Sequence, residues 1–95
     1  MERRKLSRTE FEAAEARPHG WDFVDDRIIR EWKFPDFASA LDFVNRVGEL
    51  AEAADHHPDI HFGWGYARIE LTTHDRNGVT DVDLALAGKI NDAAG

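Results

Sequence analysis

The sequence predicts an α+β domain: a four-stranded antiparallel sheet with three helices packed on one face. Two segments show the alternating pattern of paired strands, and one long segment with helical periodicity separates them. Shorter helical segments precede the first pair and follow the second. Hairpin-like pairs split by a helix favour an antiparallel sheet covered by helices, so the expected order is α-β-β-α-β-β-α.

The N-terminal segment predicts one short helix. Ser7 and Glu10 have the spacing of a capping box, in which each side chain bonds the other residue's backbone N–H. Phe11 then lies on the inner face, and the helix is expected to stop before Pro18. Residues 1–6 are expected to form a flexible tail.

The first strand pair is expected over residues 21–24 and 27–34, joined by a tight turn at Asp25-Asp26. Alternate residues of a strand point to opposite faces of the sheet. One face of the second strand therefore carries Ile28, Trp32 and Phe34, and the other carries Ile29, Glu31 and Lys33.

The longest helix is expected to open at Pro35-Asp36 and to run to about Ala54. Apolar residues recur there at steps of three and four, which predicts a stripe facing the core. The stripe consists of Phe37, Ala40, Leu41, Val44, Val47 and Ala51. Pro58 ends the region, because the residue before a proline avoids helical geometry.

The second strand pair follows this helix. Its apolar residues alternate as Ile60, Phe62 and Trp64, and then as Ala67, Ile69 and Leu71. Gly63 and Gly65 indicate a bend between the two strands. Arg68 and Glu70 fall on the opposite face of the sheet, which a partner subunit is able to cover.

The last helix is expected after a turn at Asn77-Gly78. Thr80 and Asp83 have the spacing of a second capping box, and the helix then continues through Ile90.

The composition fits one folded domain over residues 1–95. The chain is 42% hydrophobic and has no cysteine, which excludes disulfides, thiolate zinc sites and cysteine nucleophiles. Its net charge of −7 argues against binding to nucleic acid or anionic membranes, because phosphate contacts need Lys and Arg. The N-terminus lacks the apolar run of a signal peptide and no stretch is long enough to span a bilayer, so a cytoplasmic location is expected.

Three of the five histidines carry the strongest functional signal: His56 and His57 end the long helix, and His74 ends a strand. Histidine exchanges protons near neutral pH because its ordinary pKa is about 6.5. Glu52 precedes His56 by four residues, which predicts contact on one helix face. An alternative is a helix C-terminus that carries histidines because they favour the negative end of the dipole.

Other interpretations of these residues stay open at this point. His74 alone is more often a surface residue, and a capping role fully explains Asp83. A metal site would use His56, His57, His61 and His74. Against it, adjacent histidines rarely converge on one ion, and His61 alternates away from the apolar face of its strand.

The sequence also argues against a Ser-His-Asp hydrolase. The only serines are Ser7 and Ser39, and neither has the context of a nucleophile elbow. Trp32 is expected in the core, whereas Trp21 and Trp64 are open candidates for stacking on a flat heterocycle.

The combined spacing resembles the signature of a known family, the pterin-4a-carbinolamine dehydratases. The signature residues are Glu52-x3-His56-His57-Pro58-x5-Trp64-x9-His74-x8-Asp83. Similar residues extend the resemblance over residues 20–92, at Gly20-Trp21, Phe34-Pro35-Asp36-Phe37, Thr73-His74 and Gly78-Val79-Thr80.

The resemblance implies a four-stranded antiparallel sheet with three helices, assembled as a homodimer or a homotetramer with sheets joined across subunits. It implies a hydro-lyase that removes water from 4a-hydroxytetrahydropterin to give quinonoid dihydropterin, which recycles the pterin after aromatic amino-acid hydroxylation. The implied partner is a small-molecule pterin, with no metal, no bound cofactor, no nucleic acid and no membrane.

The resemblance also implies roles for residues. The catalytic set is His56, His57 and His74. Of these, His56 and His74 are the acid and base, in an order not assigned, and His57 chiefly binds and orients the pterin. Glu52 would orient His56, and Asp83 would cap the last helix and support the loop with His74. The expected pocket residues are Pro58, Thr73, Asp75 and Arg76, with Trp21 as a further wall.

A competing function is a non-catalytic binding protein on the same fold, as a transcription cofactor or an assembly factor. Relatives used only in this way can lose the histidines, and all three are present here. The sequence therefore favours catalysis, alone or together with binding.

Overall fold

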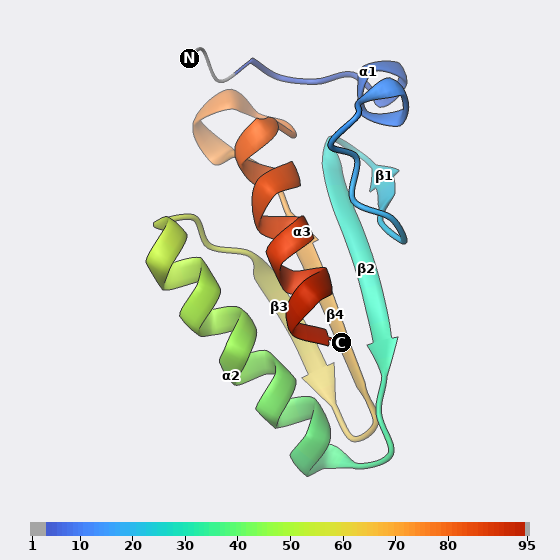
Figure 1. Cartoon of the computed structure of the whole chain (residues 1–95), viewed down its shortest axis with the longest axis vertical. Helices are drawn as coiled ribbons and strands as arrows, with labels where there is room; N and C mark the ends of the chain where they lie inside the picture. Colours follow the sequence, from blue (N-terminus) through green and yellow to red (C-terminus); the bar gives the residue numbers. More distant parts are fainter. Residues whose placement is uncertain (1–3, 95) are drawn as a thin grey trace.

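A computed structural model describes residues 4–94 and has the predicted order of elements (Figure 1). The elements are α1 (Arg8–Ala13), β1 (Asp22–Val24), β2 (Arg27–Lys33), α2 (Phe37–Ala54), β3 (Asp59–Gly63), β4 (Tyr66–Leu71), the short 3₁₀ turn η1 (His74–Arg76) and α3 (Asp81–Ala94). The predicted α+β fold class is confirmed. The turn η1 was not predicted and begins three residues after the end of β4.

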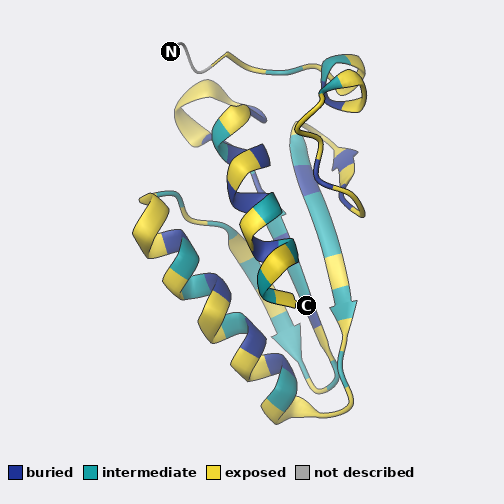
Figure 2. Cartoon of the chain, viewed as in Figure 1, coloured by how far each residue is buried: buried dark blue, intermediate teal, exposed yellow. Residues whose placement is uncertain are grey.

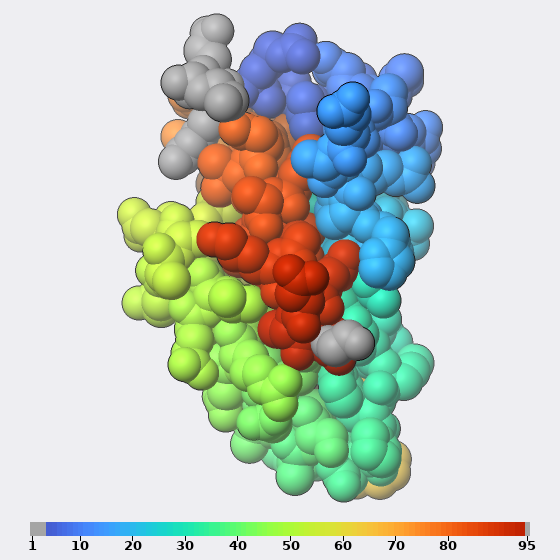
Figure 3. Space-filling model, in the orientation of Figure 1, coloured from blue at the N-terminus to red at the C-terminus, as the bar shows by residue number. Residues whose placement is uncertain are grey.

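The four strands form one antiparallel sheet in the order β1-β2-β4-β3. On the covered face, Ile28 of β2 pairs with Leu71 of β4, and Ile69 of β4 pairs with Ile60 of β3. Both α2 and α3 lie across this face, with α3 over the middle of the sheet and α2 beside it (Figures 1 and 3). The opposite face is left uncovered and carries charged residues, as the alternation predicts.

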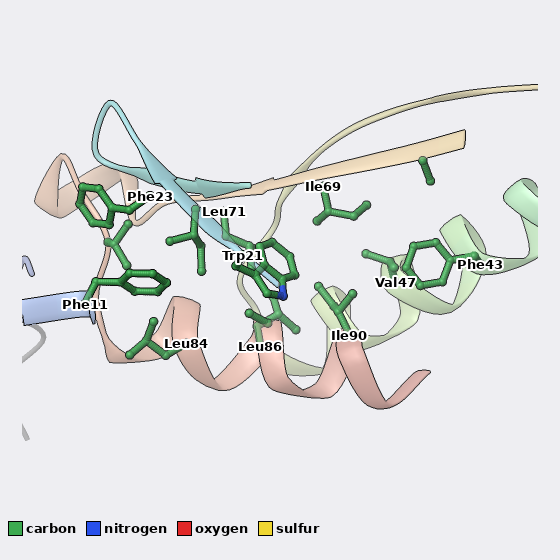
Figure 4. Packing of buried hydrophobic residues seen from close by; sticks show 14 residues of the cluster. Phe11, Trp21, Phe23, Phe43, Val47, Ile69, Leu71, Leu84, Leu86 and Ile90 are labelled. Carbon is green, nitrogen blue, oxygen red and sulfur yellow. The ribbon is translucent and has the colours of Figure 1, made fainter. Parts of the chain in front are cut away.

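The core lies between the sheet and α3. Figure 4 shows Ile69 and Leu71 of β4 pointing toward Leu86 and Ile90 of α3, and all four are at most 1% exposed. Phe11, Phe23 and Leu84 close one end of this core, and Phe43 and Val47 close the other. Each fully buried apolar side chain of this size contributes roughly 2 kcal/mol, so these contacts fix α3 on the sheet.

Local signals at the turns and caps are confirmed. Ser7 and Glu10 form the capping box with both hydrogen bonds present. Asp25 and Asp26 both have positive φ, of 50° and 59°. A two-residue turn of this kind matches the twist of an antiparallel hairpin, and it sets the register between β1 and β2.

The predicted apolar stripe of α2 is partly wrong. Phe37 and Leu41 are exposed at 46% and 38%, whereas Phe43 is buried and takes a place in the core. The buried residues of α2 lie on its side toward α3 and the sheet (Figure 2). The helix packs beside the edge strand β3, so its outer flank is left uncovered. On that flank the ring centroids of Phe37 and Phe62 lie 5.6 Å apart.

Two further expectations need correction. Trp64 does not continue β3, because it lies in the turn between β3 and β4 and is 73% exposed. The predicted tail over residues 1–6 does not extend to Leu6, whose N–H donates to the carbonyl of Val79 at 2.7 Å. Residues 1–3 lie outside the described part of the chain. Within residues 4–94, no helix has the length and apolarity needed to cross a membrane.

Candidate active site

The C-terminus of α2, the start of β3, the end of β4 and the start of α3 meet at one end of the sheet (Figure 1). Asp55 ends α2 in the left-handed conformation, with φ of 50°. The N–H of His56 then donates back to the carbonyl of Ala51 at 3.1 Å, as in a Schellman motif. This reversal takes His56 off the helix surface and directs it toward the start of α3.

His56 contacts Asp83 of α3, with Nε2 and Oδ1 separated by 2.5 Å. The His56 side chain is 11% exposed and that of Asp83 is fully buried. The other carboxylate oxygen of Asp83 accepts the backbone N–H of Thr80 at 2.9 Å and the hydroxyl of Thr73 at 2.8 Å. Asp83 therefore caps α3, as predicted, and also holds a histidine from another segment.

His57 lies in a different environment from its neighbour. Its Nε2 contacts Oε2 of Glu52, and both side chains are more than half exposed. The expected pairing of Glu52 with His56 is therefore wrong. The i,i+4 relation holds only within a regular helix, and the left-handed turn at Asp55 breaks it.

His74 begins η1, directly after Thr73. Thr73 pairs with Gly78 across a short bridge, in which the Thr73 N–H donates to the Gly78 carbonyl at 2.8 Å. Asn77 has a φ of 56° and closes the turn, as the Asn-Gly signal predicts. The closed loop holds the exposed side chain of His74 beside the end of β4.

The three predicted histidines line one hollow of about 450 Å³. Its walls are Asp55, His56, His57, Pro58, Asp59, Thr73, His74 and Asp75. This volume lies in the range of small-molecule sites, roughly 300 to 1,000 Å³. Two larger hollows, of about 550 Å³ between α2 and α3 and of about 610 Å³ beside His19 and Asn91, include none of these three histidines. The smaller hollow is therefore the candidate active site.

Two predicted pocket residues do not line this hollow. Trp21 is 2% exposed, and its indole N–H donates to Oδ1 of Asn91 at 2.9 Å. Asn91 lies eight residues beyond Asp83 on α3, or about 12 Å along the helix axis, so Trp21 belongs to the core at the far end of α3. Arg76 lies in η1, but its guanidinium is directed to the carbonyl of Asp75.

His61 lies apart from the other histidines. It belongs to the uncovered face of the sheet, where its Nε2 is 3.6 Å from Oε2 of Glu70. Within the described part of the chain, no three potential ligands gather as they would around a metal ion.

Sequence reasoning missed three residues at the site. Asp55 and Asp59 line the hollow, and their position beside the His-His-Pro run was an available signal. Thr80 is fully buried, and its hydroxyl lies 2.8 Å from that of Thr73. The sequence showed Thr80 only as a helix cap, because its contact with Thr73 depends on the fold.

Comparisons with known proteins point to one family. The model of the family described as "Pterin 4 alpha carbinolamine dehydratase" matches residues 4–93. A relative from Rubrobacter xylanophilus is 52% identical over 73 residues, which cover 76% of this chain and 68% of the relative. A relative from Paracoccus denitrificans is 45% identical over 92 residues, which cover 95% of this chain and 86% of the relative. Both bear the name "putative pterin-4-alpha-carbinolamine dehydratase".

Two solved structures share the fold. A crystal structure named transcriptional coactivator/pterin dehydratase, from Brucella melitensis, has a TM-score of 0.87 and 36% identity, and the match covers 96% of this chain and 99% of that one. A pterin dehydratase-like protein described as a RuBisCO assembly factor in the alpha-carboxysome has a TM-score of 0.66 and 22% identity. That match covers 79% of this chain and 87% of the other. With a family model spanning nearly all described residues and relatives of this identity, the chain belongs to the pterin-4a-carbinolamine dehydratase family.

Proposed function

We propose that this chain dehydrates 4a-hydroxytetrahydropterin to quinonoid dihydropterin by histidine acid/base catalysis. The observation that carries the proposal is the single hollow lined by His56, His57 and His74. The family model that matches this chain is named for a dehydratase, and a dehydratase is a hydro-lyase. This agrees with the chemistry of imidazoles around a small-molecule site.

The reaction needs two proton transfers. An acid protonates the 4a-hydroxyl, the bond from C4a to oxygen breaks, and water leaves. A base removes the proton from N5, and the electrons of that N–H bond form the new double bond between N5 and C4a. The reaction is redox-neutral and needs only proton transfers and the loss of water, so we propose no cofactor.

We assign the two proton transfers to two of the histidines and substrate binding to the third. His56 and His74 come from different segments and line one hollow, so both are placed to act on one substrate as acid and base. His57 is exposed beside Glu52 and is placed to bind and orient the pterin. Pro58, Thr73 and Asp75 line the remaining walls.

The biological setting proposed is pterin recycling after aromatic amino-acid hydroxylation, in the cytoplasm. We further propose that residues 1–95 act as one domain in a homodimer or a homotetramer. The strand β3 lies at the edge of the sheet, where unpaired backbone groups favour pairing with a second chain. Phe37, Leu41 and Trp64 are exposed on α2 and beside β3, as an interface between subunits requires.

A second candidate function is non-catalytic binding on the same fold. The Brucella melitensis neighbour is named a transcriptional coactivator as well as a pterin dehydratase. The exposed apolar residues on α2 would serve such a role equally well. The two candidates differ in whether the histidines matter, and an activity measurement separates them.

The test is a stopped-flow assay in which a hydroxylase generates 4a-hydroxytetrahydropterin and its ultraviolet decay is followed. We expect the protein to accelerate the decay and His74→Ala to abolish most of that acceleration. His19→Ala is the matched control, since His19 is exposed and its contacts at the far end of α3 use its backbone carbonyl. Folded protein that gives no acceleration would overturn the proposal and favour the binding function.

A further inference from the structure

A buried polar network stands behind His56. Asp83 and Thr80 are fully buried and Thr73 is 2% exposed. Buried polar groups are costly unless they are hydrogen-bonded, so each proton in such a cluster has a defined place. The donor and acceptor capacities of these groups then assign each proton.

The hydroxyl of Thr73 donates to Oδ2 of Asp83 at 2.8 Å. A hydroxyl has one proton, so in the 2.8 Å contact between the two threonine hydroxyls the donor is Thr80. Oδ2 of Asp83 also accepts the backbone N–H of Thr80 at 2.9 Å. The network therefore runs in one direction, from Thr80 through Thr73 to Asp83.

The tautomer of His56 follows from its contact with the other oxygen of this carboxylate, Oδ1. An ionised carboxylate only accepts hydrogen bonds, so at Oδ1 the proton comes from Nε2 of His56, 2.5 Å away. In the neutral imidazole one nitrogen carries the proton and the other carries a lone pair. The neutral ring of His56 therefore has its lone pair on Nδ1, and this residue lines the hollow.

We infer that the Thr80–Thr73–Asp83 network holds His56 in the Nε2–H tautomer and makes its Nδ1 the base of the reaction. Thr73 and Thr80 are then positioning residues, which act through Asp83 and His56. The use of Nδ1 as base rests on the proposed dehydratase function, whereas the tautomer does not.

The proton inventory of the reaction follows. Nδ1 of His56 takes the proton from N5, and the resulting imidazolium keeps its Nε2–H bond to Asp83. His74, which lines the same hollow, gives a proton to the 4a-hydroxyl, which leaves as water. Proton exchange with solvent then returns both rings to their starting states.

The first test measures the tautomer directly by two-bond ¹H–¹⁵N correlation of the imidazoles, at a pH where they are neutral. His56→Gln identifies the His56 signals by their loss. We expect protonated Nε2 and unprotonated Nδ1 in the wild-type protein. A proton on Nδ1 would overturn the inference, whether or not the protein is a dehydratase.

The second test removes one hydroxyl from the network. Thr73→Val should mix the tautomers of His56 and lower kcat about tenfold with little change in KM, since it removes a hydrogen bond to a charged group. Thr73→Ser keeps the hydroxyl and should retain kcat within about twofold. Thr72→Val is the matched control, because its hydroxyl donates to the Asp26 carbonyl instead.

The outcomes separate the two proposals. An unchanged tautomer and an unchanged kcat in Thr73→Val would overturn the positioning role. If Thr73→Val does not fold, Thr80→Val removes the other hydroxyl and the same spectrum and assay apply. If the wild-type protein has the expected tautomer but no dehydratase activity, the network stands and the proposed function fails.

Discussion

His56 and His57 are neighbours in the sequence, yet their side chains lie in opposite environments. His56 is 11% exposed and contacts a fully buried carboxylate contributed by another helix. His57 is 56% exposed and contacts Glu52, which lies near the end of the preceding helix α2 and is 77% exposed. One histidine is held by the tertiary fold and the other by a local contact at the surface.

This difference supports the division of roles that we propose for the two histidines. Hydrogen bonds and charges in a buried network interact more strongly, because little water screens them. An exposed ion pair contributes little and leaves both side chains free to move. The buried side of the site is therefore suited to fixing a reacting atom, and the exposed side to accommodating a ligand.

The largest effect should come from breaking the buried side. Asp83→Ala leaves His56, Thr73 and the N–H of Thr80 without their acceptor. We therefore expect the free energy of unfolding to fall by about 3 kcal/mol and the dehydratase activity to be lost. Chemical denaturation and the decay assay measure the two effects. Asp81→Ala is the control, since Asp81 is exposed in the same helical turn. Equal losses of stability and activity in both variants would contradict the special role of the buried contacts of Asp83.

Replacing each of the two histidines should affect a different kinetic parameter, kcat for His56 and KM for His57. We expect His56→Ala to lower kcat by about a hundredfold, as is typical for loss of a general acid or base. We expect His57→Ala chiefly to raise KM, because an orienting contact is made in the ground state as well. Steady-state kinetics on both variants check this division. A larger fall of kcat in the His57 variant would reverse the assignment.

The sequence predicted the fold well because its signals are local. Alternation in β2 and β4 gave the faces of the sheet, and the Asp25-Asp26 turn and the Ser7 capping box were found where expected. The exposure of Phe37 and Leu41 could not be predicted, because helical periodicity shows an apolar stripe without showing which flank the sheet covers.

The sequence singled out residues that share one hollow, but it did not show which of them contact each other. The three histidines do share one hollow. The partners were not found, because a left-handed residue at Asp55 redirects His56 and no periodicity marks it in advance. The contact between Thr73 and Thr80 joins a strand end to a helix cap, so it exists only once α3 has packed on the sheet.

A smaller effect is expected from the exposed side. Glu52→Gln removes the charge beside His57, and we expect KM to rise by less than about fivefold, since exposed ion pairs contribute at most about 1 kcal/mol. The rise should shrink at high ionic strength, because salt screens exposed charges. Glu49→Gln, one turn earlier on α2, is the control. A rise that persists at high salt would mean that Glu52 contacts the substrate directly.

The smallest effect should come from the opposite end of α2. Asp36 caps this helix by accepting the N–H of Ser39 at 2.8 Å, and this hydrogen bond lowers the pKa of the Asp36 carboxyl below its ordinary 3.8. A carboxyl whose pKa is lower in the folded state stabilises the protein above its unfolded pKa, and that contribution is lost as the pH falls through the folded pKa.

Asp36→Asn keeps a capping oxygen but does not titrate, so it isolates this contribution. We expect the wild-type protein to have the slightly higher thermal midpoint near neutral pH, and the difference between the two proteins to vanish in strong acid. The decay assay at neutral pH should not distinguish them, because Asp36 lies at the far end of α2 from the hollow. An altered kcat in this variant would show that the whole length of α2, and not only its turn at Asp55, positions the histidines.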